Sequence, residues 1–228
     1  MKRRAWCQAA AAVAAVGLGL AQVQAQPAVQ ARLQQAVISD DYLWIRRWLA
    51  QGGDPNTVVV GTIPALVRAL QLESWRVAQE LLTSTRLDLN AASGSGETPL
   101  MMACIRGHLP LVQQMVAMGA DINRPGWTPL HYAASATLPD SVAIARLLLE
   151  HHAYIDAPSP NQSTPLMLAA QYGSQEMVLL LLNAGADVLA RNELGLGVVD
   201  FARKSDRDYM VKMMQQAEQA AQRGKGSW

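Results

Sequence analysis

Apolar residues return along this chain in a pattern that repeats about every 33 positions. Apolar residues spaced three and four apart, on one face of a turn of 3.6 residues, predict a helix in each copy. The matched triplets are Ile45, Trp48 and Leu49; Val112, Met115 and Val116; and Val178, Leu181 and Leu182. A shorter apolar stretch precedes each such helix and carries an alanine at position 36, 69, 103, 133, 169 or 202. The pattern therefore predicts six copies of a short helix followed by a longer one.

A repeated Thr-Pro-Leu marks where the short helix begins, at residues 98–100, 128–130 and 164–166. A threonine hydroxyl can accept a hydrogen bond from an unpaired backbone N–H at a helix start. Proline fits the first helical position because its missing N–H has no partner there. Gly119 and Gly185 can take the left-handed conformation that ends the longer helix.

Thr-Pro-Leu with this period resembles the ankyrin repeat, and residues 126–134, Gly-Trp-Thr-Pro-Leu-His-Tyr-Ala-Ala, match its signature. The resemblance extends from about residue 29 to about residue 215. It implies an all-α solenoid of antiparallel helix pairs joined by β-hairpin loops, in which stacking covers the apolar face that one repeat leaves bare. The expected repeats are about 29–56, 57–90, 91–123, 124–156, 157–189 and 190–216.

The ends and two irregular steps depart from this pattern. The first and last repeats lack Thr-Pro-Leu, so we expect them to be caps. We place the repeat domain at residues 26–222 and a polar tail at 217–228, which extends the last helix and then frays. The 30-residue step is short in the loop at 123–126, and the 36-residue step holds three extra residues around 136–139.

Residues 1–25 have the order of a secretory signal peptide. Three basic residues at positions 2–4 precede an apolar run at 9–20, and Val-Gln-Ala at 23–25 offers a cleavage site. The 12-residue run is short for a membrane span. The flanks favour a bacterial signal, so we expect export to the periplasm and no stable membrane insertion after cleavage. A eukaryotic secretory route and an uncleaved N-terminal anchor are the alternatives.

Composition narrows the class of protein further. Half of the residues are hydrophobic, which suffices for a core, and the net charge is +1. Cleavage after residue 25 leaves 16 basic and 18 acidic residues and one cysteine, Cys104. No face is loaded with basic residues, so we expect no nucleic-acid partner. A single cysteine cannot form an internal disulfide.

The sequence carries no catalytic motif. It has no phosphate-binding loop ending in Lys-Ser or Lys-Thr, no His-Glu-x-x-His and no zinc-type cysteine pair. We therefore expect no enzyme, no cofactor and no metal. Adjacent His151 and His152 do not share a helix face, which disfavours a metal site there. The resemblance implies that His131 links neighbouring repeats, and Cys104 falls at a small core position.

The resemblance implies a protein partner that binds the hairpin tips and the concave face of the short helices. The candidates are Val58, Val59, Val60, Arg124 and Trp127 at tips, and Ile105, Arg106, Tyr132, Gln171 and Tyr172 on short helices. The three valines and Trp127 could instead pack between hairpins. A monomeric inhibitor, immunity protein or stress-related scaffold would be consistent with such an exported binding protein. The alternative is a small-ligand or metal-binding protein, or an enzyme, that uses the groove near residues 136–139.

Overall fold

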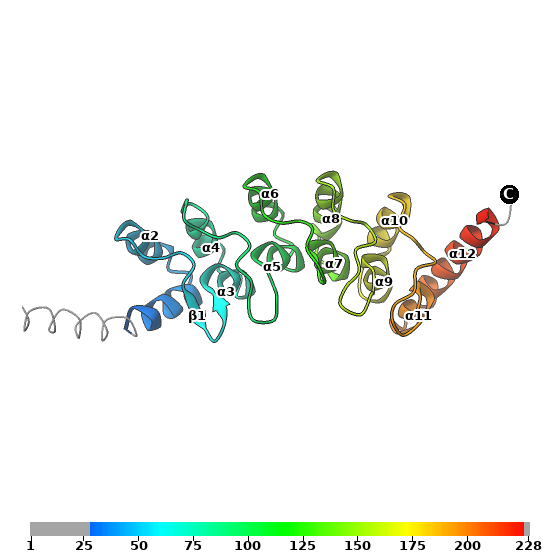
Figure 1. The fold of residues 1–228 in the computed structure, drawn as a ribbon, viewed down its shortest axis with the longest axis horizontal. Coiled ribbons are helices and arrows are strands. Elements are labelled where there is room, and N and C mark those ends of the chain that lie inside the picture. The colour runs from blue at the N-terminus through cyan, green and yellow to red at the C-terminus, as the bar shows by residue number, and fades with distance from the viewer. Residues whose placement is uncertain (1–27, 226–228) are drawn as a thin grey trace, which may run out of the picture. The chain divides into compact units, whose positions relative to one another are not determined.

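The computed structural model describes residues 28–225 (Figure 1), and these divide into two compact units, residues 28–86 and residues 87–225. The predicted signal peptide, residues 1–25, lies outside the described residues, as do residues 226–228 of the predicted tail.

The first unit holds two helix pairs and a short hairpin. A helix over residues 28–38 is followed by α2 (Tyr42–Ala50), β1 (Val58–Val60), β2 (Ile63–Pro64), α3 (Ala65–Gln71) and α4 (Trp75–Leu81). Both α2 and α3 pack on α4. Its largest fully buried side chains are Leu33, Ile45, Leu66, Leu70 and Leu81. These side chains lie on the helix faces that pack together, and those faces form the core of the unit.

The second unit contains four helix pairs. They are α5 (Pro99–Ile105) with α6 (Leu109–Ala117), α7 (Pro129–Ser135) with α8 (Ser141–Glu150), α9 (Pro165–Gln171) with α10 (Gln175–Asn183), and α11 (Val198–Arg203) with α12 (Asp208–Lys225). The short helices α5, α7, α9 and α11 pack in one row, and α6, α8 and α10 form a second row (Figure 1). The all-α solenoid and its six helix pairs are confirmed.

The predicted helix starts have the expected chemistry. Thr98 Oγ1 accepts a hydrogen bond from the N–H of Met101 at 3.3 Å, and Thr164 Oγ1 accepts one from Met167 at 3.4 Å. Proline occupies the first turn of α5, α7 and α9. At the other end, α12 continues through the predicted tail as far as Lys225.

Among the described residues, the expected β-hairpin loops show strand pairing only in the first unit. Within residues 28–225 strands pair at β1 and β2 alone, with Val58 opposite Pro64. The later loops close as tight turns, in which the N–H of Ser93, Ser159 or Asn192 donates to the carbonyl four residues on, at 2.9–3.0 Å. Strand pairing is not needed there because side chains of the preceding loop satisfy backbone groups of the next one.

A ladder of Asn and Asp side chains makes these links between loops. The side-chain oxygens of Asn90, Asn123 and Asp156 accept backbone N–H bonds from Asp121, Tyr154 and Asp187, at 2.9, 2.8 and 2.9 Å. Both steps of the ladder are 33 residues, although Thr-Pro-Leu steps by 30 and then by 36. The three residues missing from the loop before Thr128 are therefore regained between α7 and α8.

The insertion around residues 136–139 packs against the preceding repeat. A Cβ atom placed on Gly107, in the turn between α5 and α6, would lie 2.8 Å from the Cβ of Leu138. Leu138 is still 44% exposed. The insertion thus rests on the turn of its neighbour, and Gly107 leaves room for it.

Candidate protein-binding surface

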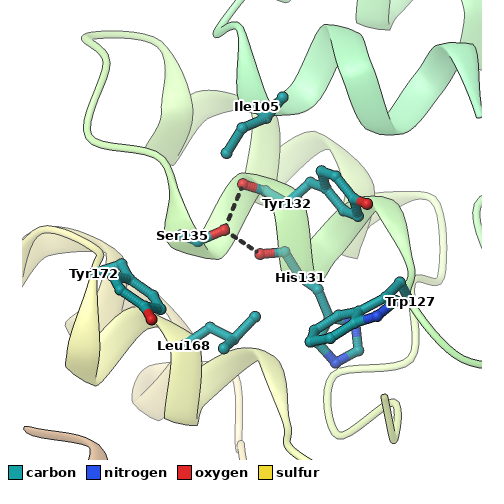
Figure 2. Close-up of a pocket in the computed structure, with 7 residues that line it drawn as sticks. All are labelled: Ile105, Trp127, His131, Tyr132, Ser135, Leu168 and Tyr172. Carbon is teal, nitrogen blue, oxygen red and sulfur yellow. Dashed lines mark hydrogen bonds between the residues drawn. The ribbon is translucent and has the colours of Figure 1, made fainter. Parts of the chain in front are cut away.

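A pocket of about 310 Å³ opens beside the short helices α5, α7 and α9 (Figure 2). Its walls are mostly apolar or aromatic and come from three successive repeats. The lining residues are Ile105, Trp127, His131, Tyr132, Ser135, Leu168 and Tyr172. Four of the residues predicted to bind a partner, Ile105, Trp127, Tyr132 and Tyr172, are thus brought together.

The helical repeat explains why these side chains reach the surface. Tyr132 and Leu168 each directly precede a marker alanine, Ala133 or Ala169, which is fully buried. Consecutive helical residues point about 100° apart, so burial of the alanine leaves its neighbour at the edge of the row. Tyr172 follows the end of α9 and is 53% exposed. The pocket is therefore built on regular helices rather than on a long loop.

Trp127 stands in the shortened loop, directly before the helix cap Thr128. Its indole meets the His131 ring edge to face, with ring centroids 5.3 Å apart and an interplanar angle of 84°. The side chain is 38% exposed. The indole thus packs on the helix of its own repeat and also lines the pocket.

His131 forms a buried link between two repeats. Its Nε2 lies 3.0 Å from the Ser163 carbonyl oxygen, which can only accept, so Nε2 carries the proton. Nδ1 then accepts from the Thr128 N–H at 3.2 Å and from the Thr128 hydroxyl at 2.9 Å. The predicted linking role is confirmed. Burial lowers the pKa of His131 to about 4, so this wall of the pocket is neutral near pH 7.

The remaining polar groups of the pocket are also uncharged. The Ser135 hydroxyl donates to the carbonyl of His131 at 2.9 Å and is 3.2 Å from that of Tyr132, as the dashed lines in Figure 2 show. Burial raises the pKa of Tyr132, and the nearby Glu97 carboxylate raises it further. With no ionised group in its lining, the pocket suits an apolar or aromatic group.

Three other candidates on the second unit lie outside this pocket. Arg106 is the exposed C-cap of α5, and Gln171 is the half-buried last residue of α9. Arg124 lines a second pocket of about 310 Å³. The other residues of that pocket are Asn123, Pro125, Gly126, Tyr154, Ala157 and Pro158.

The three valines belong to the first unit and do not form one exposed tip. Val58 is 37% exposed, whereas Val59 is 3% exposed, because successive strand residues point to opposite sides. Val60 is half-buried. Val58 lines a hollow with Trp48, Gly53 and other residues of this unit. The choice of Val59 as a contact residue is therefore wrong, since its side chain is inaccessible.

Sequence reasoning missed several residues of the two pockets. Leu168 and Tyr132 occupy the same place before a marker alanine, so alignment of the repeats could have found Leu168. Ser135 has no such signal. Tyr154, in the next loop, was not among the expected contact residues, although it is 68% exposed.

The cysteine and the paired histidines lie in the core and at a helix end, respectively. Cys104 is fully buried, and burial raises the pKa of its thiol. His151 and His152 are exposed at the end of α8. Residues 28–225 contain no cluster of three or more His, Cys, Asp and Glu side chains suited to a metal ion. In the same part of the chain no helix combines the length and apolar character that crossing a membrane requires.

Comparison with known protein families identifies the same repeat that the sequence pattern indicates. The family described as ankyrin repeats, in three copies, matches residues 66–159 and 125–192, more than half of the chain. This chain belongs to the ankyrin-repeat family. Ankyrin repeats are generally protein–protein interaction modules, and proteins built from them are typically non-enzymatic scaffolds.

Similar ankyrin-repeat proteins come from animals and bacteria. The chain is 31% identical over 137 residues to mouse Ankyrin repeat and SAM domain-containing protein 6, a match that covers 60% of this chain and 12% of that protein. It is 36% identical over 114 residues to Putative ankyrin repeat protein YahD of Escherichia coli, covering 46% of this chain and 56% of that one. The matches thus span a minority of the first protein and just over half of the second.

Proposed function

We propose that this protein binds another protein through the surface formed by α5, α7 and α9. The observation that carries the proposal is the neutral aromatic pocket between these helices. Tryptophan and tyrosine are the residue types most enriched among energetically dominant contact residues. Helices α7 and α9 hold Tyr132 and Leu168, and Tyr172 caps the end of α9, so little order has to be gained on binding.

A photo-cross-linking experiment tests which face meets the partner. Tyr172 is replaced by the photoreactive residue p-benzoylphenylalanine, and the full chain is irradiated with an extract of the cells that make it. We expect a discrete cross-linked product. The matched controls carry the same residue at Leu179 of α10 or Tyr209 of α12, which are 41% and 50% exposed on other helices.

A competitor distinguishes binding at this face from general adhesion. Unlabelled wild-type protein should suppress the product, whereas a folded Arg106→Ala, Tyr132→Ala and Tyr172→Ala triple variant should not. Circular dichroism reports whether the variant is folded. Equal cross-linking from Tyr172, Leu179 and Tyr209 would count against the proposed surface.

A small uncharged ligand is the second candidate, favoured by the size of the pocket. About 310 Å³ lies within the roughly 300–1,000 Å³ that small-molecule sites enclose. Native mass spectrometry of protein purified from its source separates the two candidates. A bound small molecule that a Tyr172→Ala variant loses would favour this reading over a protein partner.

We propose in addition that the protein is exported to the periplasm after cleavage near residue 25. The basic start, apolar run and Val-Gln-Ala of residues 2–25 support this. The intact mass of the protein recovered from cells is the test. A chain starting near residue 26 is expected, and a full-length membrane-associated chain would instead indicate an uncleaved anchor.

A further inference from the structure

The shortened loop before α7 separates two pockets. Trp127 lines the pocket between the short helices, and residues 123–126 line the second pocket. Gly126 has φ +81°, and Gly96 at +84° and Gly195 at +72° hold the same place, two residues before the N-cap of the following helix. The shortened loop therefore keeps its final turn, and the missing residues come from the part before that turn. Arg124 and Trp127 are three residues apart, which limits their Cα atoms to about 10 Å.

The second pocket differs from the first because it contains a charge. Arg124 is the one ionisable cation among its lining residues, beside Tyr154, Pro125 and Pro158. Within residues 28–225 the Arg124 guanidinium has neither a hydrogen bond nor an ion pair. Other loop and helix arginines are engaged: Arg191 pairs with Glu218 at 3.1 Å, and Arg46 with Glu80 at 2.9 Å.

A guanidinium of this kind is suited to a carboxylate. Arginine presents parallel N–H donors that fit the two oxygens of a carboxylate. Apolar neighbours on one side reduce the screening that weakens exposed ion pairs. No acidic residue lines either pocket, so nothing within them competes for Arg124. An incoming acidic side chain would therefore find an available cation.

From these features we infer that the surface recognises an extended partner segment of defined chemistry. The segment places one uncharged aromatic side chain in the pocket beside Trp127 and Tyr172, and a carboxylate about three residues away on Arg124. This inference rests on the proposed function and specifies its partner. The carboxylate can lie on either side of the aromatic residue in the partner's sequence, because a segment running in either direction can cross the loop between the two pockets.

Synthetic peptides test the two contacts separately on the full chain. The probe is an N-acetylated, C-amidated nine-residue glycine peptide with a central Trp and a Glu three positions away on each side. Binding is followed by NMR shifts of the Tyr172 and Tyr209 ring signals, assigned with Tyr→Ala variants. We expect a dissociation constant in the range of about 0.1–1 mM at low salt. Gln in place of both Glu residues should weaken binding at least about 5-fold, and Ala in place of Trp should abolish it.

Variants of the protein supply the matched controls. Arg124→Glu should reverse the preference, so that a peptide with Lys at both Glu positions binds better than the original. Arg146→Glu makes the same charge change on an exposed residue of α8 and should leave the preference intact. Tyr132→Ala, followed by the Tyr172 ring signal, should weaken binding of both Trp-containing peptides, and Tyr209→Ala on α12 should not.

The result that overturns the inference is equal binding of the Glu and Gln peptides, or no binding of any peptide. Loss of preference in both Arg124→Glu and Arg146→Glu would also overturn it, because net charge would then be responsible. The proposed function has its own readout. If Tyr172 still captures a partner and Arg124→Glu does not affect that capture, the carboxylate contact is wrong while the protein-binding surface stands.

Discussion

One position of the short helix shows how a single residue changes the connection between repeats. Met101, His131 and Met167 all stand three residues after a capping threonine, and each accepts that threonine's N–H, through sulfur at 3.4–3.5 Å or through Nδ1 at 3.2 Å. His131 has in addition a second ring nitrogen, which reaches the Ser163 carbonyl. The two methionines thus accept the N–H of the capping threonine, as His131 does, but of the three residues only His131 also bonds to the next repeat.

This difference predicts how stability depends on pH. The folded-state pKa of His131, about 4, lies below its ordinary value of 6.5, so the folded chain binds fewer protons between these values. The stabilisation is complete above about pH 6.5 and is lost as the pH falls toward 4. His131→Met should therefore be less stable than wild type at neutral pH. The gap should narrow by about 2 kcal/mol between about pH 7.5 and pH 5, measured by urea unfolding.

A gap that stays constant with pH would contradict the buried, neutral state of His131. Met167→Leu provides the control, because it changes the equivalent position without a titrating group and should show the same pH dependence as wild type.

Gln162 offers a second prediction at the scale of one residue. Its φ is +62°, at the turn position where Gly96, Gly126 and Gly195 stand with φ of +84°, +81° and +72°. A side chain in this left-handed region costs about 1 kcal/mol relative to glycine. Gln162→Gly should raise the free energy of unfolding by about 0.5–1 kcal/mol. The gain is reduced because glycine also increases the conformational entropy of the unfolded chain. Thermal denaturation would show this, and Gly195→Gln should have the opposite sign.

At the scale of elements, the loops are tied by side chains rather than by strands. Asn123 makes two bonds to the following loop, from its Nδ2 to the His152 carbonyl and from the Tyr154 N–H to its Oδ1, both at 2.8 Å. Asn90, one step earlier, makes one such bond, accepting from the Asp121 N–H at 2.9 Å. The loop ladder is therefore strongest beside the shortened loop and its two pockets.

The ladder predicts graded costs on mutation. A net hydrogen bond contributes about 1 kcal/mol, so Asn123→Ala should destabilise the chain by about 2 kcal/mol and Asn90→Ala by about 1 kcal/mol. Chemical denaturation of both variants gives the comparison. Equal costs would mean that the second bond of Asn123 adds nothing beyond what water supplies.

At the scale of the whole molecule, the stability of a repeat protein is largely local, and within the second unit each short helix packs on the next. A methyl group at Gly173, between α9 and α10, would lie 2.5 Å from the Ala134 carbonyl oxygen. Because backbone occupies that space, Gly173→Ala should cost about 1–3 kcal/mol. Hydrogen exchange should accelerate in α7, α9 and α10, while protection within residues 28–86 changes little. Uniform acceleration across the described residues would instead indicate one cooperative unit.

Much of the fold could be predicted because its determinants are local in sequence. Capping threonines, prolines at the first turn and apolar residues three and four apart act within a few residues, so Thr98 and Thr164 could be assigned from their neighbours alone. The 33-residue period then required stacking, since one helix pair cannot bury its own apolar face. Ile105, Trp127, Tyr132 and Tyr172 followed from their places in the repeat.

The tertiary structure decided what those residues form together. Leu168 completes the pocket with Tyr132, although 36 positions separate them, because α7 and α9 lie side by side. Val59 is buried while Val58 is exposed, because successive residues of β1 point to opposite sides of the hairpin. The loop ladder keeps its 33-residue steps across a deletion and an insertion of three residues, which places Arg124 and Trp127 between two pockets. The sequence by itself determined the helices and their repetition, since these depend on short-range chemistry. The binding surface depends on which side chains of different repeats meet, and only packing in three dimensions decides that.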